Sequence, residues 1–226
     1  METASRASSV LAGLEAIRGW QEAFYRDLHR HPELSHQERR TASRVADSLS
    51  HAGYEVHRDV GGTGVVGILG NGDGPVVLLR ADMDALPVRE ATGLPYASTD
   101  MARDASGAEV PVVHACGHDL HVACLLGAAR LLAGARETWS GTLVALFQPA
   151  EETGDDAQSM VDGGLRAIVP RPEVALAQHV LPFPAGEVAT APAPSWPPTV
   201  CASGCTGGAL TGPCPRQRSI RSSWRR

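Results

Sequence analysis

The sequence predicts an α/β fold in which a mixed sheet is flanked by helices. Three apolar runs of strand length, at residues 76–79, 143–147 and 174–177, alternate with segments whose apolar side chains recur at helical spacing. Each run is followed within a few residues by side chains that can bind a metal ion. Ligands of open α/β sheets bind beyond the carboxyl ends of the strands, so separate strands can bring these side chains together.

The first two helices are predicted on either side of a proline. Apolar residues at helical spacing over residues 8–30 predict one helix, and Pro32 marks its end. Ser35 followed three residues later by Glu38 is typical of a capping box, which predicts a second helix to about residue 52.

Two further helices are expected in the second half of the chain. Asp119 is expected to cap a helix whose apolar side is followed by Gly134, a residue that commonly ends helices. Residues 155–165 are expected to form a shorter helix.

The strands are predicted from apolar runs and turn residues. Residues 64–82 are expected to form a hairpin, since two apolar arms flank an Asn-Gly-Asp-Gly turn. Further strands are expected at 142–148 and 174–180. The polar segment 86–112 is expected to be irregular.

Length, composition and charge limit the class of protein. With 226 residues and 43% hydrophobic content, the chain can bury one full α/β core. Its sequence has no apolar stretch near the ~18 residues of a membrane helix, and residues 1–9 lack the layout of a secretory signal. A net charge of −5 gives no basic face for nucleic acid. We therefore expect a cytoplasmic protein without membrane or nucleic-acid partners.

The run from His114 to Asp119 is the most specific motif of the chain. Cys116 and His118 stand on either side of Gly117, close enough to bind one metal ion or two adjacent ions. Each has an alternative role: Cys116 as a small buried hydrophobic residue, and His118 as a hydrogen-bond partner where a helix begins. Few cysteines precede residue 200, so a disulfide framework is not expected.

Glu151, Glu152 and His179 follow predicted strands and complete the candidate site. The two glutamates are adjacent, so by strand alternation their side chains point in different directions. One can bind a metal while the other faces the substrate as a general base. The alternatives are a solvated pair of turn residues for the glutamates and a buried, hydrogen-bonded core residue for His179.

Four further residues could support the ligands. Asp82 and Asp84 could orient imidazole rings from behind, as carboxylates often do, or they could cap the loop that follows the strand. His114 and His121 could do the same or could simply pack in a loop or on a helix face. Cys124 lies on the apolar side of its helix and is expected in the core.

Five motifs, in order along the chain, resemble those of the M20 metallopeptidase family. They are DLHRHPELS at 27–35, LRADMDALP at 79–87, HACGHD at 114–119, FQPAEE at 147–152 and QH at 178–179. The resemblance is closest to the amidohydrolase branch, which includes hippurate hydrolases, N-acyl-amino-acid amidohydrolases and auxin-conjugate hydrolases.

The resemblance implies a zinc-peptidase-like catalytic domain with two divalent ions, Zn, Mn, Ni or Co. The substrate class would be small-molecule N-acyl amino acids, cleaved at the amide bond. Cys116 would be the bridging thiolate, with His118, Glu152 and His179 as further ligands. Glu151 would be the general base that activates water.

The chain also departs from the family pattern. Members are about twice as long, with an inserted lid and dimerisation domain and a returning segment that supplies a last histidine ligand. Residues 1–190 are therefore expected to be the N-terminal part of the catalytic domain, and 191–226 an aberrant, disordered tail. The homodimer expected for the full-length family is doubtful here, and activity is expected to be weak or absent.

A frameshift near Pro194 would explain this tail. In another reading frame with GC-rich codons, the segment from Cys205 to the end can read HGRGAHGSMPQAAIDPVVLAA, which resembles the expected lid sequence. The DNA around the codon for Pro194 tests this, because stop codons in that frame would contradict it.

The sequence leaves two other functions open. One is a non-catalytic module that binds a metal or a partner, and the other is a dipeptidase or carboxypeptidase of the same M20 family. Metal content and turnover of wild type and Glu151→Gln separate the first from an enzyme.

Overall fold

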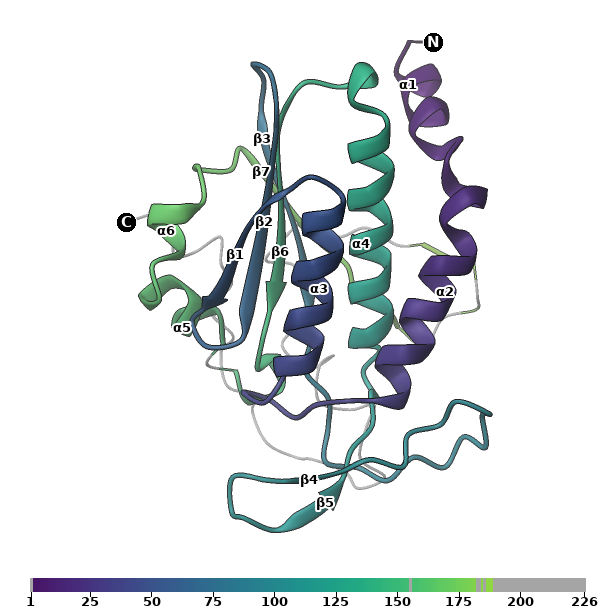
Figure 1. The fold of residues 1–226 in the computed structure, drawn as a ribbon, viewed down its shortest axis with the longest axis vertical. Helices are drawn as coiled ribbons and strands as arrows, with labels where there is room; N and C mark the ends of the chain where they lie inside the picture. The colour runs from purple at the N-terminus through teal and green to yellow at the C-terminus, as the bar shows by residue number, and fades with distance from the viewer. Residues whose placement is uncertain (1, 155, 182–183, 185, 189–226) are drawn as a thin grey trace.

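The computed structural model describes residues 2–154, 156–181, 184 and 186–188. Its centre is a mixed sheet of five strands in the order β1-β2-β6-β3-β7, and helices lie on both of its faces (Figure 1). The α/β fold class predicted from the sequence is confirmed. The expected tail over residues 191–226 and the frameshift near Pro194 lie outside the described residues.

Four helices lie on one side of the sheet: α1 Glu2–Leu11, α2 Leu14–Arg30, α3 Arg39–His51 and α4 His118–Gly134 (Figure 1). The single helix expected over residues 8–30 is two helices, with a break before α2 at Gly13. A Cβ atom at Gly13 would lie 3.1 Å from the Leu131 side chain of α4. The break therefore coincides with a close approach between this turn and α4.

The capping box expected at the start of α3 is not formed. The helix begins after Glu38, and neither Ser35 nor Glu38 caps it through a side chain. Instead, the carboxylate of Glu33 accepts hydrogen bonds from the backbone N–H groups of Arg40 (2.9 Å) and Thr41 (2.7 Å). These are two of the N–H groups that a helix start leaves unpaired. Ser35 and Glu38 are thereby available for contacts elsewhere.

The five strands are β1 Glu55–Val60, β2 Gly64–Asn71, β3 Val76–Asp82, β6 Gly141–Gln148 and β7 Val174–Ala177. The hairpin expected over residues 64–82 is wrong, because β6 lies between β2 and β3, antiparallel to the first and parallel to the second. The actual hairpin is formed by β1 and β2. The strand expected at 174–180 ends at residue 177.

The side chains of β6 explain why this strand lies in the middle of the sheet. Leu143, Ala145 and Phe147 face the α2–α4 layer, while Val144 and Leu146 face the opposite side. All five are at most 5% exposed. A strand that is apolar on both faces is most stable in the middle of a covered sheet, with neighbours on both edges.

Two short helices, α5 Asp156–Asp162 and α6 Leu165–Ile168, lie on the other side of the sheet (Figure 1). They replace the single helix expected over residues 155–165. A break falls at Gly164, which has φ +93. Leucine and methionine side chains from this layer complete the second hydrophobic cluster.

The segment between β3 and α4 extends away from the sheet, largely irregular as expected (Figure 1). It contains a small two-stranded sheet, β4 Met101–Arg103 and β5 Glu109–Pro111. Two 3-10 turns, Arg136–Thr138 and Glu151–Thr153, flank β6. Within the described part of the chain, no helix has both the length and the apolar character needed to cross a membrane.

Candidate metal centre

The candidate ligands lie at one edge of the sheet. Strands β6 and β7 both run parallel to β3, so the carboxyl ends of all three strands point the same way. Asp82 ends β3, while Glu152 and His179 follow β6 and β7 by a few residues. His118 begins α4 at the same edge and contacts residues of these segments.

Cys116, His118 and Glu152 form a compact group of potential ligands. One ligand atom from each lies within 4.8 Å of the others. The imidazole Nε2 of His118 and Oε1 of Glu152 are 3.8 Å apart, and both are buried without a hydrogen-bond partner among the described residues. Buried polar atoms almost always have hydrogen-bond partners, so two such atoms that lack them and lie close together beside a thiol fit a bound metal ion.

Asp84 orients this group from behind. The Nδ1 atom of His118 lies 2.9 Å from the backbone oxygen of Asp84 and 3.2 Å from its Oδ1. Because both neighbours are acceptors, Nδ1 keeps its proton, and Nε2 is the ring nitrogen that can bind a metal. The other carboxylate oxygen of Asp84 accepts from the backbone N–H of Glu152 at 3.0 Å. One buried carboxylate thus positions two of the three candidate ligands.

The charges around His118 favour its protonated form when no metal is bound. Burial lowers the pKa of His118, but the hydrogen bond to Asp84 and the nearby charges of Asp82 and Glu152 outweigh this and raise it to about 9. A metal ion can bind Nε2 only after displacing that proton.

A second group of ligand types, Asp82, His118 and His121, is equally close together, but two of its members, Asp82 and His121, are already hydrogen bonded. The backbone N–H of Val180 donates to Nε2 of His121 at 2.9 Å, so Nδ1 carries the proton and donates to Asp82 at 2.6 Å. No ring lone pair of His121 is then available to a metal. His121 instead joins Asp82 to the segment that carries His179.

Asp82 is held as a carboxylate in this arrangement. Burial by itself would raise its pKa, but Arg80, at 2.8 Å, and the hydrogen bond from His121 lower it below the usual value. Asp82 is thus a buried acceptor for His121, and its expected role of orienting a metal-bound imidazole stays a prediction.

Glu151 and Glu152 both face His118. Oε2 of Glu151 is 3.9 Å from His118 Nε2, close to the 3.8 Å distance of Glu152. The expectation that they diverge by strand alternation is wrong, because β6 ends at Gln148 and both lie in a 3-10 turn. The turn follows Ala150, whose φ of +51 bends the chain sharply after the strand.

His179 lies beside the compact group without belonging to it. Its ring centroid is 6.0 Å from that of His118 and 4.7 Å from that of His121. Its Nδ1 donates to the backbone oxygen of Val180 at 2.6 Å, which leaves Nε2 with its lone pair. The residue is exposed, and the structure places it beside the site but not in the compact group of ligand atoms.

His114 is buried, and in the part of the chain that the structure describes neither of its ring nitrogens has a hydrogen-bond partner. Burial lowers its pKa to about 4. Its expected orienting role stays a prediction, since the described contacts include no hydrogen bond from His114 to a candidate ligand.

Asp119 pairs with His29 near the end of α2, outside the candidate ligand group. Helix α4 begins at His118 with Gly117 at its N-cap, so Asp119 lies in the first turn rather than at the cap. Its carboxylate lies 2.6 Å from Nδ1 of His29, whose Nε2 is 3.1 Å from Glu90. The cluster joins the end of α2 to the start of α4.

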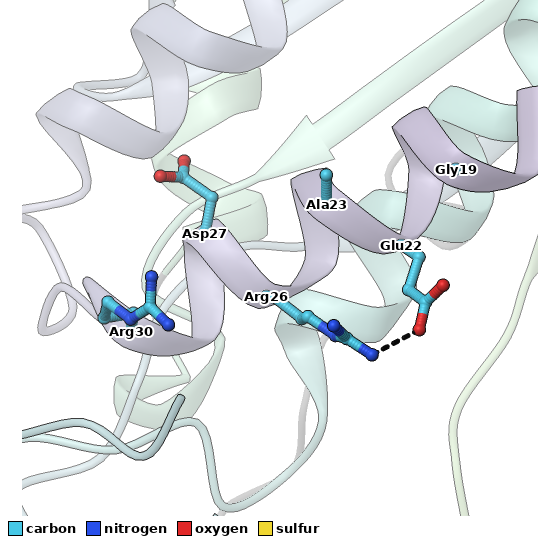
Figure 2. Close-up of a pocket in the computed structure, with 6 residues that line it drawn as sticks. All are labelled: Gly19, Glu22, Ala23, Arg26, Asp27 and Arg30. Atoms are coloured by element: carbon cyan, nitrogen blue, oxygen red, sulfur yellow. Dashed lines mark hydrogen bonds and ion pairs between the residues drawn. The ribbon is translucent and has the colours of Figure 1, made fainter. Parts of the chain in front are cut away.

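A surface depression lies along α2 and shares no residue with the candidate metal centre (Figure 2). It is lined by Gly19, Glu22, Ala23, Arg26, Asp27 and Arg30. Arg26 pairs with Glu22 within the helix, and Asp27 pairs with Arg40. A depression along one helix, with ion pairs at Glu22, Arg26 and Asp27, does not compete with the buried ligand group as a reaction site.

The sequence profile described as peptidase family M20/M25/M40 matches residues 78–194. The chain belongs to this family. The matched range contains four of the five motifs, every candidate ligand and the candidate base, so the resemblance of the chain to the M20 family is confirmed.

Two relatives of this M20 chain have equal identity but different activities in their names. The hippurate hydrolase of Campylobacter jejuni is 44% identical over 151 residues, which cover 66% of this chain and 36% of that protein. Thermostable carboxypeptidase 1 of Saccharolobus solfataricus is 44% identical over 153 residues, covering 66% of this chain and 37% of that protein.

The crystal structure of the YXEP protein of Bacillus subtilis, described as a dinuclear metal-binding peptidase from the M20 family, has a similar fold. Its TM-score is 0.64 at 36% identity, with 74% of this chain and 44% of that chain covered. The chain thus spans less than half the length of these three M20 relatives.

Proposed function

We propose that this chain carries the main metal-binding group of an amidohydrolase that cleaves the amide bond of N-acyl amino acids. The observation that carries the proposal is the trio of Cys116, His118 and Glu152, whose ligand atoms lie within 4.8 Å of one another. Nε2 of His118 and Oε1 of Glu152 are buried without a hydrogen-bond partner within the described ranges. A thiolate, an imidazole and a carboxylate form a donor set that suits Zn, Mn, Ni or Co.

Each residue has a defined task in the proposed reaction. Cys116, His118 and Glu152 hold the metal, with His179 approaching from β7 as a further ligand. Two bound divalent ions would lower the pKa of a water molecule and polarise the amide carbonyl. Glu151 is placed to take a proton from the attacking water and to deliver it to the leaving amine. Its position supports this task, since its carboxylate faces the ligand group and its side chain is 12% exposed.

The substrate class rests on the relatives rather than on the site. An N-acyl amino acid is favoured by the hippurate hydrolase, whereas removal of a C-terminal residue from an N-blocked peptide is favoured by the equally similar carboxypeptidase. Both reactions hydrolyse an amide next to a free carboxylate. The same metal group and the same base serve both.

Hydrolysis assays on the purified chain test the proposal. With Zn²⁺ or Mn²⁺ added, we expect slow release of glycine from N-benzoylglycine, faster than release of the terminal residue from an N-blocked dipeptide. Chelation should abolish both. Glu151→Gln should retain the metal and lose turnover, because it removes the base and leaves the ligands in place.

Other outcomes distinguish the alternatives. Preference for the blocked dipeptide would identify a carboxypeptidase. Tight metal binding through Cys116 with no turnover above that of Glu151→Gln would support a non-catalytic metal-binding module. Turnover at an ordinary enzyme rate would contradict the expectation that this chain is weakly active by itself.

A further inference from the structure

Glu38 has a buried carboxylate and stands directly before helix α3. Helix capping does not explain why this carboxylate is buried. Its side chain is 0% exposed, and it makes no capping hydrogen bond to α3. Burying a carboxylate is costly unless several donors satisfy it. The contacts of Glu38 therefore indicate what its charge stabilises.

Three donors from three separate segments converge on this carboxylate. Oε1 accepts from the backbone N–H of His36 at 3.0 Å and from that of Ala150 at 2.8 Å. Oε2 accepts from the hydroxyl of Thr63, between β1 and β2, at 2.6 Å. Burial raises the pKa of Glu38, and the bonds from Thr63 and Ala150 oppose that rise.

The bond to Ala150 reaches the turn that carries Glu151 and Glu152. Ala150 is fully buried and has φ +51 and ψ +39, a left-handed conformation that an alanine adopts only where its surroundings hold it. Two residues later, the N–H of Glu152 donates to Asp84 at 3.0 Å. Two buried carboxylates thus accept hydrogen bonds from the backbone on either side of Glu151.

We propose that Glu38 is a positioning residue for the Glu151–Glu152 turn, acting through its hydrogen bond to the N–H of Ala150. The inference rests on the proposed function, in which Glu152 binds the metal and Glu151 is the base. When Oε1 of Glu38 holds Ala150, Glu152 is directed at His118 before any metal arrives. Positioning of this kind lowers the cost of assembling a metal site.

Zn²⁺ affinity of the full chain, measured by competition with a chromophoric chelator, tests the proposal. Glu38→Met keeps a similar volume and removes both acceptors, and should weaken Zn²⁺ binding about 10- to 100-fold. Glu38→Gln keeps an oxygen for the N–H groups of His36 and Ala150, and should stay within about threefold of wild type. Amide exchange at Ala150, measured without metal, should be faster only in Glu38→Met.

Thr63→Val is the matched control. It removes the third donor to the same carboxylate and leaves the bond to Ala150, so the melting temperature should fall while Zn²⁺ affinity stays within about threefold of wild type. A general loss of stability would therefore be visible without a loss of metal affinity. If Glu38→Met does not melt cooperatively, Glu38→Asp, which is too short to reach Ala150, takes its place with the same expectation.

The results for Glu38 and Cys116 variants distinguish failure of this inference from failure of the proposed function on which it rests. If Cys116→Ser weakens Zn²⁺ binding but the folded Glu38→Met or Glu38→Asp variant binds as tightly as wild type, the role of Glu38 is overturned alone. If Cys116→Ser and wild type bind Zn²⁺ equally weakly, both the metal site and the role of Glu38 are overturned.

Discussion

At the scale of single residues, the candidate site is defined by which ring nitrogens are left without a hydrogen bond. His118 and His121 are on the same helix, and each lies close to Asp82. Both nitrogens of His121 are engaged, whereas Nε2 of His118 is buried without a partner in the described part of the chain. Motifs alone identify both histidines as metal-capable. Only the three-dimensional contacts distinguish them, because among the described residues they leave a ring nitrogen without a hydrogen bond in His118 and none in His121.

Removing the charge of Asp84 should weaken metal binding. Asp84→Asn cannot accept hydrogen bonds at both of its side-chain positions, so it loses either the N–H of Glu152 or that of His118 Nδ1. We expect Zn²⁺ affinity to fall about 10- to 100-fold. Ser35→Ala removes one neutral donor to the same carboxylate and serves as the control, with a change of less than about threefold. Equal effects of the two substitutions would argue against the orienting role.

Gly117 should not tolerate a side chain. Its φ is +79, and a Cβ atom there would lie 2.5 Å from the Val180 side chain. Gly117→Ala should lower the free energy of unfolding by about 1–3 kcal/mol in urea titrations. At the other end of the same helix, Gly134 has open space around its Cα, so Gly134→Ala should be neutral or stabilising. A neutral Gly117→Ala would refute the described backbone at the motif.

The His29 cluster predicts a pH-dependent stability. The hydrogen bond to Asp119 is the largest cause of the raised pKa of His29, with Glu90 adding to it and burial opposing it. A raised pKa in the folded state means that the stabilisation is complete below the usual histidine pKa of about 6.5 and is lost as pH rises through the folded value.

Urea unfolding of wild type and His29→Gln between about pH 6 and pH 9, without metal, measures this effect. The stability advantage of wild type should shrink as the pH rises. An advantage that is constant or grows with pH would show that the protonated form of His29 is not stabilised by Asp119.

At the scale of helices and strands, their positions could be predicted but not their partners. The apolar runs that form β2, β3, β6 and β7 are visible in the sequence, because side-chain burial imposes their composition. The choice between a local β2–β3 hairpin and a sheet with β6 between them depends on contacts distant in sequence. The Asn-Gly-Asp-Gly turn favoured the local choice, whereas burial of β6 on both faces favours the observed one.

The failed capping box has a similar cause. Ser35 and Glu38 have the spacing of a cap, but Asp84 and Ala150 offer them partners from other segments. A local pattern cannot reveal partners that arrive from elsewhere in the fold. Local spacing therefore predicted the helix correctly and the tasks of these two side chains incorrectly.

Amide hydrogen exchange should distinguish β6 from β7. Strand β6 is hydrogen bonded on both edges and buried, so its amides should be among the slowest to exchange. Strand β7 ends the sheet and all four of its residues are exposed, so it should exchange faster by at least tenfold. Equal protection of the two strands would contradict the strand order.

At the scale of the whole molecule, the fold brings together segments that are far apart in sequence. The site draws on the ends of β3 and β6, the start of α4 and the segment after β7, while the α2–α4 layer and the α5–α6 layer cover the two faces of the sheet (Figure 1). The convergence of ligands at this edge could be predicted, because parallel strands end on the same side. The hydrogen bonds that Glu38 and Asp84 accept from one turn could not be predicted, since they depend on tertiary packing.

Cobalt absorption tests the central claim most directly, because a thiolate bound to Co²⁺ absorbs in the near ultraviolet. The titration is made in a chain whose distal cysteines are replaced by serine; these are Cys201, Cys205 and Cys214. We predict that this band appears with a stoichiometric end point and persists in Cys124→Ser, the other described cysteine. It should vanish in Cys116→Ser. A band that persists in Cys116→Ser, or no band in the parent chain, would contradict the metal centre.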